Sequence, residues 1–370
     1  MRAVGVVFSN IHDQNVPELV TNRTVGSIPF GGRYRLIDFA LSNMVNSNIY
    51  TVGVITKRNY QSLMDHVGSG KDWDLARKDG GLMFLPPFGD IGSDSLYTSR
   101  LEALKGISNF INRADEDYVV MTDCDSICRV NYEEVIDEHI ASNADITMIY
   151  VKHKAKDAVE KHVNTLRMDD SGRITSIKYI PELDGNANLF INMYVMKRSL
   201  LANLIKDSIS RNKHHFIDDV ISKNLRSYKV RGFEHKGYFA RISSLQAYYN
   251  HSMELLNDKN RDELFGDRSV FTKIRDSAPT KFGYNSVVKN SMIADGCIIE
   301  GEVENSILFR GCKVARGTKV KNCILMQNTN VGENASLNCI ITDKNVVISD
   351  RLTLSGSENH SFYIPKGTLV

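Results

Sequence analysis

The chain of 370 residues contains 42% hydrophobic and 24% charged residues and has a formal net charge of +2. This average composition excludes intrinsic disorder, a fibrous repeat and a disulfide scaffold, and the interspersed charges do not supply the long-range field that gathers nucleic acid or an anionic membrane. A chain of this length exceeds the usual size of one core, so we expect two domains, with small molecules or other proteins as partners.

The first residues, MRAVGVVFSNIHDQ, combine a short apolar run with polar residues. They contain neither a small-residue cleavage site nor a stretch of about 18 apolar residues. We therefore expect a cytoplasmic protein. Six cysteines show no CxxC spacing, and we expect them to be buried small apolar side chains.

Short apolar runs alternate with helix-period segments through the first two-thirds of the chain. This alternation is typical of a mostly parallel β-sheet covered by helices, so the expected fold class is α/β. The strands are predicted at residues 3–8, 51–56, 118–121, 145–151 and 189–196.

Two capping boxes predict helix starts. Ser99 and Ser243 are each followed three residues later by Glu or Gln, an arrangement that satisfies free amides in the first turn of a helix. The helices are predicted to run to residue 111 and to about residue 256.

The sequence repeats from about Tyr284 onward. An asparagine followed by Ser or Cys and two apolar residues recurs with starts 15, 17 and 16 residues apart, at Asn290, Asn305, Asn322 and Asn338. Apolar residues recur about every six positions, which predicts a triangular coil, the hexapeptide parallel β-helix. A β-sandwich with accidental spacing is the alternative. We predict a first domain over 1–256, a linker over 257–283 and a β-helix domain over 284–370.

The most informative run is residues 29–48, PFGGRYRLIDFALSNMVNSN, in which a Gly-Gly turn leads through two arginines into an amphipathic helix. Glycines let the backbone approach a ligand closely, and the guanidinium groups of Arg33 and Arg35 suit phosphate. This run closely resembles the signature of the glucose-1-phosphate adenylyltransferases, which make ADP-glucose from ATP and glucose 1-phosphate. The resemblance covers most of the chain. It implies a Rossmann-like, GT-A-type nucleotidyltransferase domain, a left-handed parallel β-helix domain and a tetramer.

Nucleotidyl transfer brings an anionic sugar phosphate against a triphosphate, so the site must neutralise several negative charges. Members of the family cradle the triphosphate with a GGxGxR loop after the first strand. Counted back without gaps from Arg23, the corresponding residues here are Asn10, Ile11, His12, Asp13, Gln14 and Asn15. We expect impaired ATP binding, because none of them is a glycine or an arginine and Asp13 adds repulsion.

Three further family features are altered. The lysine of an Arg-Ala-Lys-Pro stretch corresponds to Val25, and the lysine that contacts the sugar phosphate corresponds to Ile180. The first of the family's two magnesium-binding aspartates corresponds to Asp125, with Asp123 beside it, but the second corresponds to Arg241. Because arginine offers no acceptor to a cation, the comparison implies a vestigial metal position at Asp125 and no metal site in this chain.

This pattern resembles the GlgD-type chains of Gram-positive bacteria, which pair with a catalytic GlgC-type subunit. It implies a weakly or non-catalytic regulatory subunit of a heterotetramer in glycogen biosynthesis. The chain itself would bind no cofactor productively, and Mg²⁺ would be held by the catalytic partner. Whether the chain also forms a homo-oligomer alone stays open.

Two other functions compete with this interpretation. One is an active sugar-phosphate nucleotidyltransferase that uses other residues, since Asp125 persists. The other is a β-helix acyltransferase, which commonly needs a histidine base, but the one histidine after residue 258 is His360.

Arg23 and Arg35 match family positions that bind anionic regulators between the two domains, and His66 lies on a neighbouring segment. We therefore expect these three residues to form an effector site for a phosphorylated metabolite. The family's lysines nearby are replaced here, by Asn22, Val25 and Thr51. The alternative is that both arginines form ion pairs that brace the domain junction.

Overall fold

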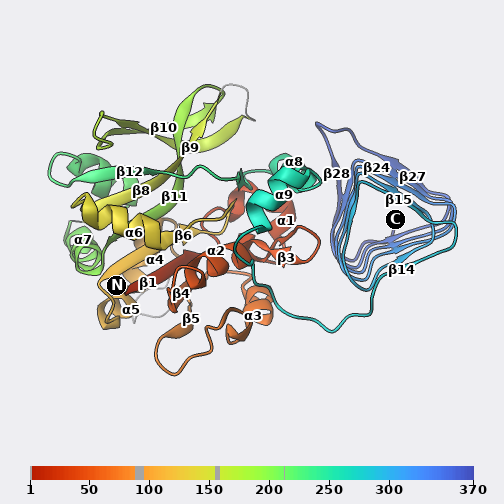
Figure 1. Ribbon diagram of the computed structural model, residues 1–370, viewed down its shortest axis with the longest axis horizontal. Helices are drawn as coiled ribbons and strands as arrows, with labels where there is room; N and C mark the ends of the chain where they lie inside the picture. Colours follow the sequence, from red (N-terminus) through yellow and green to blue (C-terminus); the bar gives the residue numbers. More distant parts are fainter. Residues whose placement is uncertain (1, 88–95, 155–158, 212) are drawn as a thin grey trace.

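The computed structural model describes residues 2–87, 96–154, 159–211 and 213–370, and it contains an α/β domain followed by a triangular coil of strands (Figure 1). All five predicted strands are present in one sheet. They are β1 (Ala3–Phe8), β4 (Thr51–Ile55), β6 (Tyr118–Asp123), β8 (Ile146–His153) and β11 (Ala187–Lys197). The predicted α/β fold class is therefore confirmed.

The central strand β1 lies between β4 and β6 and pairs in parallel with both. β11 is antiparallel to β6 and to β8, so the nine-stranded sheet is mixed. Four strands of this sheet were not predicted, and they carry more polar and exposed positions: β5 (Gly81–Leu85), β9 (Glu160–Met168), β10 (Ile174–Leu183) and β12 (Val230–Glu234). Two small ribbons complete the domain: β2 (Pro29–Phe30) with β3 (Tyr34–Arg35), and β7 (Ser126–Cys128) with β13 (Phe239–Arg241).

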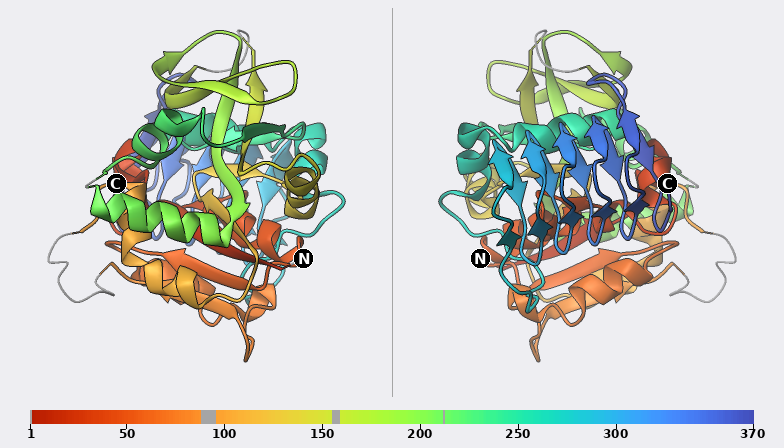
Figure 2. Two further views of the ribbon diagram at one scale, coloured as in Figure 1. Left: turned by 90° about the vertical axis from the view of Figure 1, so that its left-hand side faces the viewer. Right: turned by 90° about the vertical axis from the view of Figure 1, so that its right-hand side faces the viewer.

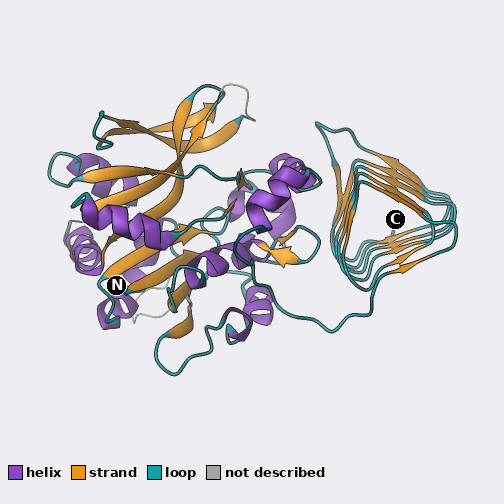
Figure 3. Cartoon of the chain, viewed as in Figure 1, coloured by secondary structure: helices purple, strands orange, loops and turns teal. Residues whose placement is uncertain are grey.

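Helices cover the sheet on both faces (Figures 1 and 3). Their bounds are α1 (Pro17–Val20), α2 (Leu36–Val45), α3 (Gln61–Val67), α4 (Arg100–Gly106), α5 (Ser108–Arg113), α6 (Tyr132–Ala141), α7 (Arg198–Ser210), α8 (Leu245–Glu254) and α9 (Asp258–Phe265). Among the described residues, none of these helices has both the length and the apolar character needed to cross a membrane.

The predicted helix starts are correct at Ser99 and wrong by one residue at Ser243. The Ser99 hydroxyl accepts from the Glu102 amide at 3.3 Å, but the helix pauses at Ile107 and continues as α5. The N-cap of α8 is Ser244, whose extended backbone places its hydroxyl 3.0 Å from the Ala247 amide.

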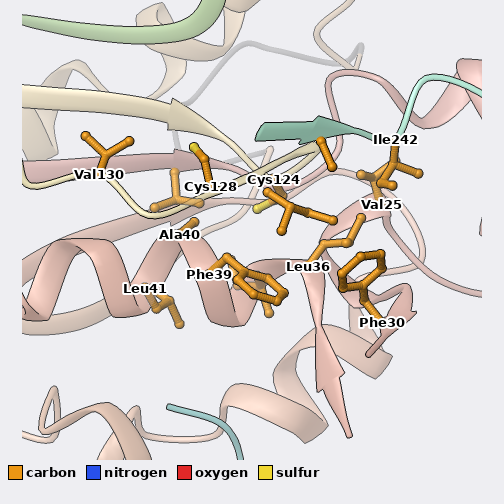
Figure 4. Packing of buried hydrophobic residues seen from close by; sticks show 14 of the residues in the cluster. Val25, Phe30, Leu36, Phe39, Ala40, Leu41, Cys124, Cys128, Val130 and Ile242 are labelled. Atoms are coloured by element: carbon orange, nitrogen blue, oxygen red, sulfur yellow. The ribbon is translucent and has the colours of Figure 1, made fainter. Parts of the chain in front are cut away.

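Two apolar cores fill the α/β domain, one on each face of the sheet. Every residue of α2 is buried, and Figure 4 shows its Leu36 and Phe39 beside Cys124 and Cys128, which follow β6. All six cysteines are free and buried, as predicted.

The segment 257–283, predicted to be a linker, contains helix α9. The Asn257 side chain accepts from the Lys259 amide at 2.9 Å and caps this helix. Phe265, at its end, stacks on Tyr34 with ring centroids 5.1 Å apart. α9 is rich in charged residues and packs on the first domain along one side only, so its sequence shows little of the periodicity of an amphipathic helix. The segment was therefore predicted to be a linker.

The C-terminal domain is the predicted parallel β-helix, and its first strand, β14 (Lys281–Phe282), begins slightly before the expected residue 284. Its three sheets each contain five short parallel strands in chain order, β14-β17-β20-β23-β26, β15-β18-β21-β24-β27 and β16-β19-β22-β25-β28 (Figure 2). Asn290, Asn305 and Asn322 adopt positive φ at one corner, and Cys339 takes that role in the next turn.

The strands of the β-helix are very short. They are β15 (Val287–Lys289), β16 (Met292–Ile293), β17 (Ile298–Ile299), β18 (Glu302–Glu304), β19 (Ile307–Leu308), β20 (Lys313–Val314), β21 (Lys319–Lys321), β22 (Ile324–Leu325), β23 (Asn330–Val331), β24 (Ser336–Asn338), β25 (Ile340–Thr342), β26 (Val347–Ile348), β27 (Thr353–Ser355) and β28 (Phe362–Ile364).

One face of the β-helix packs on the first domain. Phe309 and Met326 belong to the same apolar core as Tyr248 of α8 and Leu255, the residue after this helix, and the Tyr249 hydroxyl donates to the Asn322 carbonyl at 2.8 Å. A shared core fixes the two domains against each other.

Candidate functional site

The carboxyl ends of the parallel neighbours β1 and β6 bring two distant segments together. Residues 9–15 follow β1, and Asp123 and Asp125 stand at the end of β6. Ligands of open α/β sheets bind at such strand ends. This edge of the sheet is therefore the candidate site.

The two aspartates at this edge are each paired with an arginine. Both guanidinium nitrogens Nη1 and Nη2 of Arg100 contact the Asp123 carboxylate, at 2.6 and 2.7 Å, and Nε of Arg241 lies 3.2 Å from Oδ2 of Asp125. The aspartates are each 1% exposed, and the arginines 9% and 3%. Burial favours a protonated Asp123, but Arg100 and His12 outweigh it and hold the pKa of that carboxyl well below its usual range.

Different elements carry the two arginines into the site. Arg100 is the first residue of α4, and its guanidinium lies 4.6 Å from the ring centroid of Phe8 at the end of β1. Arg241 ends β13, which pairs with β7 directly after Asp125. Arg241 was predicted from the sequence, but Arg100 was not. One feature of the sequence pointed to Arg100. It is a cation in the first turn of a predicted helix, where the helix dipole disfavours positive charge, and such a position indicates a carboxylate nearby.

His12 completes the cluster. Its Nε2 lies 2.8 Å from Oδ2 of Asp123 and 3.8 Å from Oδ2 of Asp125, and ligand atoms of these three residues lie within 4.8 Å of one another. Such a spacing suits a metal ion by itself. However, the arginines already neutralise both carboxylates, and a divalent cation would have to displace two buried guanidinium groups. The residues therefore do not fit a magnesium site.

Side chains of the segment that corresponds to the family's phosphate loop form hydrogen bonds with neighbouring parts of the first domain. Asn10 accepts from the Tyr97 hydroxyl at 2.8 Å, and Asp13, in a short 3₁₀ turn that includes Asn15, accepts from the Val25 amide at 2.9 Å. Burial raises the pKa of Asp13 to about 7, and the Val25 amide and Lys57 only partly oppose it. The amide that Asp13 occupies is thus not available to a phosphate.

Two apolar side chains stand where the family has lysines. Val25 is 2% exposed. Ile180 of β10 pairs with Val163 of β9 and packs on the main core, while Ile11 packs on the second core. These contacts are those of structural side chains, and they supply no charge for a nucleotide or a sugar phosphate.

The predicted effector residues gather at the domain junction, but each already has a protein partner. Arg23 Nη2 lies 2.6 Å from both carboxylate oxygens of Asp343 in the β-helix domain. Arg35 Nη1 donates to the Ser62 carbonyl at 2.6 Å, and His66 Nε2 lies 2.6 Å from Oδ1 of Asp38.

One cation of this junction escaped the sequence analysis. Lys344 is largely buried, and burial together with the nearby charges of Arg35 and Arg23 lowers its pKa to about 6. Burial, with the charge of Arg23, lowers the pKa of Arg35 to about 10. Burial, with the charge of Arg35, lowers the pKa of His66 below its usual value. Lys344 lies in a turn of the repeat without any distinguishing motif, so only the docking of the domains reveals it.

Comparison with known proteins matches both domains. Residues 20–258 match the family model of nucleotidyl transferases, and residues 278–361 match the GlmU-like C-terminal hexapeptide model. The second match agrees with the left-handed sense expected of the β-helix.

Full-length relatives are similar over most of the chain. The glycogen biosynthesis protein GlgD of Bacillus subtilis (strain 168) is 34% identical over 98% of this chain and 96% of its own length. GlgD of Geobacillus stearothermophilus is 34% identical over 86% of this chain and 83% of its own length. A glucose-1-phosphate adenylyltransferase of Clostridium perfringens (strain 13 / Type A) is 30% identical over 89% and 84%.

Proposed function

The chain belongs to the nucleotidyl transferase family that contains GlgD and the glucose-1-phosphate adenylyltransferases, and on this premise we propose that it is a regulatory partner subunit with little or no catalysis of its own. In this proposal it assembles with a catalytic GlgC-type subunit into a heterotetramer of glycogen biosynthesis. The catalytic subunit holds Mg²⁺ and makes ADP-glucose, and this chain modulates its rate.

The observation that carries the proposal is the pairing of Asp123 with Arg100 and of Asp125 with Arg241. Nucleotidyl transfer develops negative charge around the α-phosphorus, and a metal that bridges phosphate oxygens stabilises this charge. Here the carboxylates that a metal would use are neutralised by buried guanidinium groups. Both guanidinium groups are buried and already paired with these carboxylates, so a phosphate would have to compete with the aspartates for them.

The loss of the phosphate loop adds to this defect. A triphosphate needs backbone amides that point at it, whereas the segment here is closed by Tyr97 and by the contact of Asp13 with Val25. Removal of a single preorganised electrostatic contact typically costs about 10²–10³ in rate. Losses within one site do not simply add, but the combined loss of the metal site and the phosphate loop supports a negligible rate of turnover for this chain.

We expect the purified chain, given ATP, Mg²⁺ and glucose 1-phosphate, to release pyrophosphate at least about 10³-fold more slowly than a GlgC-type subunit assayed in parallel. A mixture of the two chains should co-elute in size-exclusion chromatography and show an altered kcat or KM for the catalytic subunit. The catalytic subunit mixed with the denatured chain is the control. Brisk ADP-glucose formation by this chain alone would instead support the alternative function, an active nucleotidyltransferase.

We further propose that the regulatory role includes an anionic effector at the domain junction, where Arg23, Arg35, His66 and Lys344 converge. Asp343 already neutralises Arg23, so the cation that remains for a ligand is chiefly Lys344, beside Arg35. Burial, together with the nearby like charges of Arg35 and Arg23, lowers its pKa, and a bound phosphate would relieve the repulsion between those charges. Ion pairs that only brace the junction are the competing interpretation.

Fructose 1,6-bisphosphate is a suitable probe for calorimetry on the isolated chain. Lys344 is mostly neutral above pH 6 in the free protein, and a bound anion would raise its pKa, so binding should take up a proton and weaken as the pH rises from 6.5 to about 8. The Lys344→Met variant should lose the proton uptake and about tenfold in affinity, whereas Lys313→Met, on an outer strand of the β-helix, should not. Absence of binding at millimolar probe would remove the effector proposal.

A further inference from the structure

Strand β12 is an edge of the nine-stranded sheet, because β8 is the one strand with which it pairs in the described part of the chain (Figure 1). In a parallel ladder, alternate residues bond to neighbours on opposite sides. The His235 amide, directly after β12, donates to the Tyr150 carbonyl of β8 at 2.8 Å. The backbone groups of Gly232 and Glu234, which alternate with those that face β8, therefore point away from the sheet.

One end of this outer edge is already used. Arg173 forms an antiparallel bridge with Arg231, and the Gly232 amide donates to the Gly172 carbonyl at 3.1 Å. Beyond that turn, no backbone hydrogen bond from another described segment reaches the carbonyl of Gly232 or either backbone group of Glu234. The edge is therefore open from the Gly232 carbonyl onward, and its covered end shows that it accepts antiparallel pairing.

A cavity of about 820 Å³ lies along the same edge. β12 and the residues up to Tyr238 form one wall, and α6 with the segment before it forms another. Tyr150 and Phe233 line the cavity beside charged side chains. A strand that paired with β12 would therefore have room for its side chains.

Two arginines in the cavity wall carry buried N–H groups without acceptors. Nε of Arg231 and Nη1 of Arg129 are both buried and make no hydrogen bond to any residue that the structure describes. A buried donor without an acceptor is unfavourable. Both arginines therefore favour a ligand that supplies oxygen atoms.

These two donors lie at different points along the edge. Arg231 is the second residue of β12. Burial and the nearby charge of Arg129 lower the pKa of His235, against the bond that its Nε2 donates to the Tyr238 carbonyl at 3.3 Å, so Arg129 lies near His235. Four residues of a strand span about 13 Å. A ligand that meets both arginines is therefore extended and is larger than a simple anion.

Acidic side chains also line the cavity, but most of them already have a partner. The paired acids are Asp267, with Arg129 at 3.1 Å, Glu234, with Lys152 at 2.8 Å, Glu263, with Lys259 at 3.9 Å, and Glu134, with Asn131 at 2.7 Å. The remaining acids, Glu138 and Asp170, are outnumbered by Arg231, Lys236 and Arg268. The cavity wall therefore favours a ligand that carries carboxylates.

We propose that the outer edge of β12 binds an extended acidic peptide segment of a partner protein as an added antiparallel strand. The backbone groups of Gly232 and Glu234 bond to the peptide backbone, and Arg231 and Arg129 bind two carboxylates four residues apart. In strand addition, main-chain bonds give affinity and side-chain contacts give specificity. The competing occupants are a small anion and a second copy of this chain. This site lies in the first domain, away from Asp123 and Asp125, and does not depend on the loss of catalysis.

The test uses the full chain and a fluorescent peptide of sequence TEVTVET, whose two glutamates lie four residues apart on one face of a strand. We expect binding by fluorescence anisotropy, and at least about tenfold weaker binding of the matched peptide TKVTVKT. Glu234→Pro removes the outward N–H, a change that an edge strand tolerates, and should weaken binding about tenfold relative to Glu234→Ala, which keeps this donor.

A second pair of variants tests the side-chain contact. Arg231→Gln should weaken binding about tenfold, whereas Arg316→Gln, at a 79% exposed position of the β-helix, should not. Far-UV circular dichroism melts report whether each variant folds, and Arg231→Gln decides if Glu234→Pro does not. In hydrogen exchange, the Glu234 amide of the wild-type chain should become protected when TEVTVET is added.

Several results would overturn the proposal. They are no binding at millimolar peptide, equal binding of the two peptides, and a folded Glu234→Pro chain that binds as Glu234→Ala does. Free glutarate that displaces the peptide at an equal concentration would indicate a small-anion site. If Glu234→Pro lowers the sedimenting mass and leaves peptide affinity unchanged, the edge is a contact between copies of this chain.

Discussion

Replacement of Arg100 by leucine should lower the free energy of unfolding by about 3–5 kcal/mol, the usual cost of leaving one partner of a buried ion pair without the other. Asp123 is 1% exposed and receives two hydrogen bonds from Arg100. Without them, the charged or polar contact that remains to this buried carboxylate is that with His12 Nε2, at 2.8 Å. Chemical denaturation monitored by circular dichroism measures the change.

The matched control for Arg100→Leu is Arg316→Leu. Arg316 is 79% exposed and lies 3.7 Å from Glu300, and exposed pairs of this kind contribute up to about 1 kcal/mol. The double variant Arg100→Leu/Asp123→Asn should recover part of the loss, because the buried charge is removed together with its partner. Equal losses for Arg100→Leu and Arg316→Leu would mean that the Arg100 pair does not organise the site.

The second large effect is expected at the domain junction. Asp343→Ala leaves Arg23, 3% exposed, without its carboxylate, and also removes the acceptor of the Tyr363 hydroxyl. A loss of about 3–5 kcal/mol should follow. Since the pair joins residues of the two domains, the variant should also become more sensitive to proteolysis between residues 266 and 280, where the chain passes from α9 to β14.

The control for this variant is Asp350→Ala. Asp350 is exposed on the β-helix and accepts from the Glu333 amide within the same domain. Its loss should cost no more than about 1–2 kcal/mol and leave the pattern of proteolysis unchanged. If the protease cleaves the Asp343→Ala variant no faster than the Asp350→Ala variant, the ion pair of Arg23 with Asp343 does not hold the domains together.

The fold was more predictable than the site, and particular elements show why. β1, β4 and β6 are central strands with almost continuous apolar sequences, so a short window suffices to identify them. β9 and β10 expose many of their residues, and their mixed pattern does not separate them from loops. The repeat was visible because each turn of the coil buries the same interior positions, such as Val314, Val320 and Val331.

The sequence alone determined which groups are missing from the site. An arginine at position 241 has no electron pair for a metal, and a valine at position 25 has no charge, whatever surrounds them. Tertiary structure decided what replaced those groups. Arg100 meets Asp123 because α4 begins beside the ends of β1 and β6, and Arg23 meets Asp343 only because the domains share a core. The chemical groups of each side chain are given by the sequence. Its ion pairs and its pKa depend instead on distance and burial, which long-range contacts set.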